Sequence, residues 1–264
     1  MNNTNIKIIA LIMMLIDHIG YYIPDTPVWF HWIGRVAAPL FIYCVVIGYH
    51  HTTNKSKYLV RLGAAAVAMG LLTLFINRRL TYLASIGELD GTLDYITHNF
   101  FASLFLIAFI IMLLEKKKVK YILLFIIWQV ISTVMVLYLE SNVVVSVPLE
   151  LFIFPLIGNV LLVEGSLFIV LLGVAFYYTY NDKVKVTIGY SVFCLLLALL
   201  IRRWGWMREW SFLLPFADYQ WMMIFALLFI LLYNGKRGFG LKYFFYLFYP
   251  IHIVALYFIG RFLD

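Results

Sequence analysis

Long apolar runs separated by short charged segments dominate this sequence. One run extends from Ile8 to Ile16, and others of membrane-spanning length follow at 121–139 and 186–201. Of the 264 residues, 64% are hydrophobic and 12% are charged, whereas a soluble domain is about half apolar and about a quarter charged. So few charged side chains cannot cover a globular surface in water. The sequence therefore predicts a protein that uses lipid as its solvent.

The apolar runs lack the period-2 alternation of membrane β-strands, which favours helices. We expect an all-α integral membrane protein, a polytopic bundle of about nine or ten transmembrane helices, in a single domain over residues 1–264. The first run has no small-residue cleavage site, so we expect no cleavable signal peptide. The net charge of +7 does not indicate nucleic acid as a partner, because basic residues of membrane proteins gather in cytoplasmic loops.

The spans that we expect lie at 6–23, 33–49, 58–76, 99–114, 121–139, 166–180, 186–201, 221–233 and 241–262. The region 140–164 is apolar but is interrupted by Pro148 and Pro155. It is short for a passage through a hydrocarbon core of roughly 30 Å, so we expect a re-entrant or interfacial piece. The basic loops at 54–61, 115–120, 181–185 and 234–242 then lie in the cytoplasm with the N-terminus. Arg78-Arg79 and Arg202-Arg203 fall outside and oppose this topology.

Asp17 and His18 are adjacent near the outer end of the first expected span. Ionisable groups at membrane depth are costly to keep and mark function by default. The alternative for a lone interfacial histidine or arginine is an anchor or a helix–helix hydrogen bond. We prefer that alternative for His31, which lies among aromatic residues, and the functional interpretation for Asp17 and His18.

Further polar residues fall on the same side, namely Arg35, His98 with Asn99, and Glu164. In the last expected span, Tyr246, Tyr249 and His252 are spaced by three and share one helix face. Pro250 lacks an N–H group and predicts a kink there. This group favours a binding site over an aromatic packing stripe. No metal motif, phosphate-binding loop or serine elbow is present, so we expect no metal.

The segments 6–20, 33–41, 51–62, 98–99, 234–238 and 246–252 resemble the TraX family in order, and together they cover nearly the whole chain. The Asp17-His18 and 234–238 blocks are fairly specific. The sequence departs from the family pattern between 140 and 164, where Val163-Glu164-Gly165 stands in place of an Asp-Tyr-Gly-like block.

The resemblance implies N-terminal acetylation of pilin during conjugation, and kinship with acyltransferase 3 and heparan-glucosaminide acetyltransferase. Such enzymes carry acetyl from cytoplasmic acetyl-CoA to an acceptor across the membrane, which implies a multi-pass protein of the bacterial cytoplasmic (inner) membrane. The resemblance also implies that a histidine near the first span is catalytic, and by position that residue is His18.

We therefore expect His18 to act as the general base, because an imidazole titrates near neutral pH, with Asp17 or a group from another span to orient it. Arg35 would stabilise an oxyanion or hold a carboxylate. The residues expected to bind the acceptor are His98, Asn99, Glu164, Tyr246, Tyr249 and His252. Those expected to attract the phosphates of acetyl-CoA are Lys55, Lys57, Arg61, Lys236, Arg237 and Lys242.

The acceptor stays open between a peptide amine and an envelope glycan or lipid hydroxyl. Two alternatives of other classes also stay open. The first is a multi-span transporter, since transporters also place polar groups beside broken helices. The second is a non-catalytic membrane partner of a conjugation or envelope complex.

Overall fold

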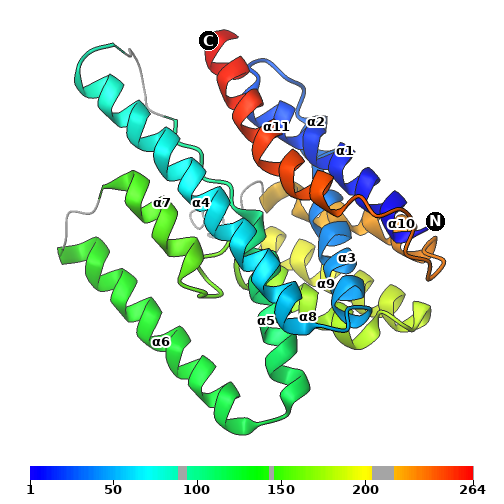
Figure 1. The fold of residues 1–264 in the computed structure, drawn as a ribbon. Coiled ribbons are helices and arrows are strands. Elements are labelled where there is room, and N and C mark those ends of the chain that lie inside the picture. The colour runs from blue at the N-terminus through cyan, green and yellow to red at the C-terminus, as the bar shows by residue number, and fades with distance from the viewer. Residues whose placement is uncertain (89–93, 143–145, 204–216, 264) are drawn as a thin grey trace. The chain divides into compact units, whose positions relative to one another are not determined.

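The structure is a computed structural model of the chain and describes residues 1–88, 94–142, 146–203 and 217–263 (Figure 1). Every regular element in these ranges is helical. Six stretches are long and apolar enough to cross a membrane: Asn3–Tyr22, Trp29–His50, Lys55–Ser85, Val119–Asn142, Lys183–Leu200 and Tyr243–Leu263. The expectation of an all-α polytopic membrane protein is confirmed. The count of nine spans stays a prediction. The expected spans at 186–201 and 221–233 leave residues 202–220 as an aromatic loop, and most of that loop, at 204–216, lies outside the described residues.

The chain divides into two compact units. Unit 1 comprises Met1–His51 and Leu171–Asp264, and unit 2 comprises Thr52–Val170. The helix α8 (Ser166–Thr179) begins in unit 2 and ends in unit 1. The expectation of a single domain stays a prediction.

In unit 1, α1 (Asn3–Tyr22) contacts α2 (Trp29–Gly34), α3 (Ala37–His50) and α11 (Lys242–Leu263). Its buried face repeats every four residues through Ile6, Ala10, Met14 and His18, as the helical period requires. Glycine permits the close contact with α11, because a Cβ at Gly260 would collide with the backbone carbonyl of Tyr22. The remaining elements of unit 1 are α9 (Lys183–Arg203), the 3₁₀ helix η2 (Ala217–Phe225) and α10 (Ala226–Leu231).

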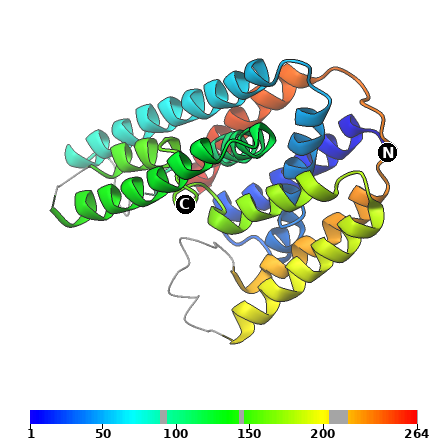
Figure 2. The same cartoon turned by 90° about the horizontal axis from the view of Figure 1, so that it is seen from below.

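One end of unit 1 gathers the N-terminal residues and two basic turns (Figure 2). The Asn3 amide donates to the Lys236 carbonyl at 2.9 Å, and the Thr4 hydroxyl donates to the Phe239 carbonyl at 2.8 Å. The ammonium group of Lys183 donates to the Leu231 carbonyl at 2.9 Å. The turns at 181–182 and 232–241 therefore lie at the same end as residues 1–4.

In unit 2, α4 (Lys55–Ser85) packs against α5 (Phe100–Lys116) and α7 (Val147–Leu156), and α6 (Val119–Asn142) contacts α5. The expected span at 58–76 lies within α4, which begins at Lys55 and continues to Ser85. Asn77, the first residue after that span, is fully buried. The side-chain amide of Asn77 donates to the Ile96 carbonyl and accepts from the Ile96 backbone amide, each at 3.0 Å.

The ten residues of α7 make a helix of about 15 Å, half the thickness of a hydrocarbon core of roughly 30 Å. This helix occupies the region 140–164 that the sequence marked as too short for a passage. Pro155 lies within it. Whether it is re-entrant or interfacial stays a prediction.

Candidate functional site

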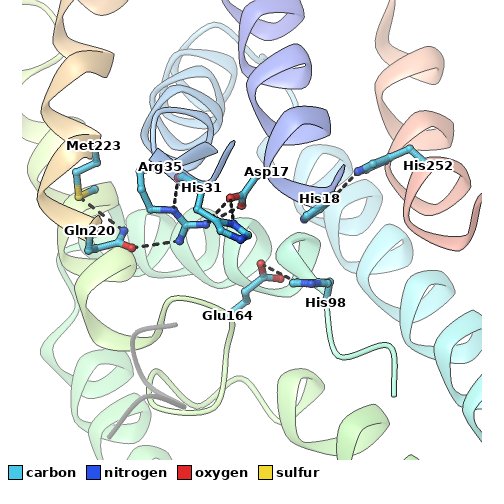
Figure 3. Close-up of polar contacts among 9 residues, drawn as sticks. All are labelled: Asp17, His18, His31, Arg35, His98, Glu164, Gln220, Met223 and His252. Atoms are coloured by element: carbon cyan, nitrogen blue, oxygen red, sulfur yellow. Dashed lines mark hydrogen bonds and ion pairs between the residues drawn. The ribbon is translucent and has the colours of Figure 1, made fainter. Parts of the chain in front are cut away.

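The first polar cluster lies in unit 1, where α1 meets α11 (Figure 3). His18 Nδ1 and His252 Nε2 are 2.7 Å apart, and each side chain is 5% exposed. The two ring planes differ by 12° and their centroids lie 4.9 Å apart. Both histidines were singled out from the sequence, and the structure brings them into direct contact across two helices.

Asp17 turns away from His18 and joins α1 to α2 instead. Its carboxylate accepts hydrogen bonds from Arg35 Nη2 at 2.6 and 2.8 Å, and His31 Nδ1 lies 3.2 Å away. Gly34 permits this contact, because a Cβ at that position would collide with the Asp17 side chain. Successive helix residues point about 100° apart, which explains why these two neighbours reach different helices.

Arg35 is fixed on several sides. Its Nε donates to the His31 carbonyl at 3.2 Å, and its Nη1 donates to Gln220 Oε1 in η2 at 3.3 Å. The arrangement therefore uses Arg35 to hold the Asp17 carboxylate and to tie α2 to η2. The two roles expected for Arg35 in acetyl transfer stay predictions.

The sequence interpretation of His31 was an anchor or a helix–helix hydrogen bond, and its 3.2 Å contact with Asp17 joins α2 to α1 in the second way. Sequence reasoning missed Gln220. Gln220 gave no signal, because it lies at the end of an aromatic loop far along the chain. Tyr249 is 5% exposed and its ring centroid lies 5.8 Å from that of His252, so these two share a buried face as expected. Tyr246 is only partly buried.

The second polar cluster lies in unit 2 and is described by itself. The Glu164 carboxylate accepts from the Asn99 backbone amide at 3.0 Å, and His98 Nδ1 lies 3.5 Å from it. The Ser103 hydroxyl, which the sequence did not single out, donates to the Glu164 carbonyl at 2.7 Å. Figure 3 shows Glu164 and His98 facing each other. The structure thus joins three of the expected acceptor-binding residues.

The backbone after Glu164 is unusual. Gly165 has a φ of +76° and Ser166 a φ of +53°, and the left-handed region is costly for a residue with a Cβ. The turn closes with a 2.8 Å hydrogen bond from the Ser166 amide to the Val163 carbonyl. This turn begins α8 and sets the position of Glu164 beside α5.

The basic residues fall into two groups, one in each unit. Lys55, Lys57 and Arg61 lie on the first turns of α4 in unit 2. Lys236 and Arg237 lie exposed in the turn of unit 1 that contacts residues 3 and 4, and Lys242 is the first residue of α11. Among the described residues, no three His, Cys, Asp or Glu side chains gather as a metal site requires.

Comparisons with known proteins agree over nearly the full length. A family model described as TraX protein matches residues 2–260. The probable fimbrial assembly protein FimC, serogroup H1, of Dichelobacter nodosus is 26% identical over 258 residues, which are 95% of this chain and 92% of that protein. No solved structure matches.

Proposed function

The chain belongs to the TraX family, and from that premise we propose that this multi-pass membrane protein is an acetyltransferase. It moves an acetyl group from cytoplasmic acetyl-CoA to an acceptor amine or hydroxyl at the outer side of the bacterial inner membrane. The observation that carries the proposal is the buried imidazole of His18 on a membrane helix, at the position for which the family resemblance implies a catalytic histidine. Burying a polar side chain among apolar helices is costly, which favours a functional reason for it.

In the proposed reaction, the acceptor amine first loses its ammonium proton to solvent. His18 then removes a second proton from the acceptor nitrogen as that nitrogen attacks the thioester carbonyl carbon. The new C–N bond forms, the C–S bond breaks, and the proton passes from His18 to the departing sulfur. The products are the acetylated amine and free CoA, and His18 returns to its neutral form. An imidazole suits both steps because its ordinary pKa, about 6.5, lies near neutral pH.

Asp17 and Arg35 belong to the proposed catalytic set through the ion pair that joins α1 to α2. Asp17 directly precedes His18, so a displacement of this pair would displace the base as well. Its carboxylate meets Arg35 and His31 rather than His18, and a supporting role follows from those contacts.

For the acceptor, we assign Glu164, His98 and Asn99 of unit 2 to recognition. A carboxylate held by a backbone amide favours a cationic amine over a neutral hydroxyl. The relative named as a fimbrial assembly protein points the same way, toward a pilin-like peptide amine. Tyr246 and Tyr249 are assigned to the same task in unit 1.

For the donor, we assign the two basic groups to the phosphates of acetyl-CoA. These residues are Lys55, Lys57, Arg61, Lys236, Arg237 and Lys242. Clustered lysines and arginines at a cytoplasmic surface attract anions of this kind. Calorimetric titration of acetyl-CoA into the detergent-purified protein tests this assignment, and a lack of binding would favour a transporter or a non-catalytic partner instead.

The decisive variant is His18→Ala. We expect it to lower the rate of acetyl transfer by roughly 10²–10⁴-fold, the usual contribution of a general base, without loss of folded protein. The assay follows transfer from labelled acetyl-CoA to a pilin N-terminal peptide in nanodiscs. His51→Ala is the matched control, because His51 is an exposed histidine at the end of α3. Wild-type transfer rates in folded His18→Ala would refute the assignment of His18.

A further inference from the structure

The hydrogen-bond partners of His252 fix the position of its proton. Its Nδ1 lies 2.7 Å from the backbone carbonyl of Phe248, one turn earlier on α11. A carbonyl oxygen only accepts hydrogen bonds, so Nδ1 of His252 must carry the hydrogen. In a neutral imidazole the other nitrogen, Nε2, is then an acceptor.

His252 Nε2 faces His18 Nδ1 at 2.7 Å, so the hydrogen of that contact must come from His18. Neutral His18 is therefore protonated at Nδ1 and carries its basic lone pair at Nε2. The neutral form is the one that burial favours for both rings, since an unpaired buried charge is costly. The direction of the contact thus follows from the Phe248 carbonyl together with the neutral form of both rings.

The ring geometry supports a strong in-line hydrogen bond. The planes of the two rings are nearly parallel. The facing nitrogen atoms of His18 and His252 lie 2.7 Å apart, which is too close for rings that are stacked face to face. The ring centroids lie 4.9 Å apart. This is about the distance between the two nitrogen atoms plus the radius of the His18 ring and the radius of the His252 ring. The two rings therefore lie edge to edge in nearly one plane, and the N–H bond of His18 points along the lone pair of His252.

We propose that His252 is a positioning residue that holds His18 in the Nδ1–H form and so presents Nε2 as the general base, rather than a residue that binds the acceptor. The inference rests on the proposed acetyl transfer only for its kinetic consequence. When Nε2 of His18 takes the acceptor proton, the imidazolium keeps its Nδ1–H bond to His252, which stabilises the positive charge. The pair returns to its starting form once Nε2 gives the proton to the leaving sulfur.

Two variants separate this role from the alternatives. His252→Leu removes the acceptor that faces His18, while His252→Gln retains an amide oxygen that reaches the place of the lost Nε2. The primary readout is ¹⁵N magnetic resonance of histidine-labelled protein in nanodiscs, which distinguishes protonated from unprotonated ring nitrogens. The His18 signals are assigned by their loss in His18→Gln, and the signals of His51 report that the fold is retained.

We expect His18 to be protonated at Nδ1 and unprotonated at Nε2 in the wild type and in His252→Gln, and to shift toward the Nε2–H form in His252→Leu. In the peptide assay, His252→Leu should lower kcat by roughly 10–100-fold, as loss of an orienting partner does, with KM for the peptide unchanged. His252→Gln should restore most of that loss.

An unchanged His18 tautomer in His252→Leu would overturn the proposal, and so would a higher KM with kcat intact, which would make His252 an acceptor-binding residue. The resonance readout needs no acetyl transfer. A wild-type protein with the expected tautomer but no transferase activity would therefore refute the proposed function and leave the positioning of His18 standing.

Discussion

At the residue scale, the two neighbours Asp17 and His18 contact different helices. Asp17 binds Arg35 next to α2, and His18 contacts His252 on α11. The sequence marked both as functional because ionisable groups at membrane depth are rare. Their partners were beyond prediction, since no periodicity relates His18 to a residue 234 positions away. Residue type and depth could be predicted for this cluster, whereas the pairing depends on how α1, α2 and α11 pack.

The Asp17–Arg35 pair offers a test at this scale. The side chains are only 16% and 12% exposed, so removal of one partner leaves the other buried and charged. We expect Asp17→Asn and Arg35→Gln each to lower the free energy of unfolding by roughly 3 kcal/mol. The double variant should lose clearly less than the sum of the two.

The measurement is unfolding of the detergent-solubilised protein by titration with sodium dodecyl sulfate. Strict additivity of the two single changes would show that the ion pair does not stabilise the α1–α2 contact. Arg61→Gln is the control, because Arg61 is an exposed arginine on α4.

At the element scale, the contact between α1 and α11 depends on a residue without a side chain. We expect Gly260→Ala to lower the free energy of unfolding by about 1–3 kcal/mol, because the new methyl group would collide with the Tyr22 carbonyl. The displaced α11 should also lengthen the His18–His252 contact, which the histidine ¹⁵N signals would report.

Gly189→Ala is the matched control on α9, where a Cβ would meet no atom within 4 Å. There we expect a gain of up to about 1 kcal/mol, because alanine is the better helix former. Equal effects of the two changes on stability would contradict close packing at Gly260.

The helix ends show where sequence reasoning about elements succeeds. The expected spans at 99–114 and 241–262 agree closely with α5 and α11, because charged turns bound them. The expected span at 58–76 stops before the polar residue Asn77, although α4 continues to Ser85 and the Ile96 backbone satisfies the Asn77 amide. Most of the short helix α2 falls between the expected spans at 6–23 and 33–49, because its six residues lie among aromatic residues and near two prolines.

At the scale of the whole molecule, composition predicted a membrane protein, and the absence of period-2 alternation in its apolar runs favoured the all-α class. The division into two units could not be predicted, because it depends on contacts between distant helices. Orientation is the remaining prediction at this scale. The positive-inside tendency places the basic turns in the cytoplasm, and unit 1 has two of them at one end with residues 1–4.

Single cysteines test this orientation. Cys44 and Cys194 are buried and would first be replaced by alanine. We expect Asn181→Cys and Lys118→Cys to react with an impermeant maleimide only in inside-out vesicles, because both lie in basic turns. Asp25→Cys and Glu88→Cys should react only from the opposite face. Labelling of positions 25 and 181 from the same face would contradict the predicted topology of unit 1.

The pairing of Asn77 with Ile96 also bears on how the chain enters the membrane. Residues 94–99 are not helical, and a backbone without internal hydrogen bonds cannot enter hydrocarbon unless another group satisfies its amides. Asn77 on α4 supplies both a donor and an acceptor for that purpose. Because α4 precedes residues 94–99 in the chain, the side chain that satisfies this segment is synthesised before the segment itself.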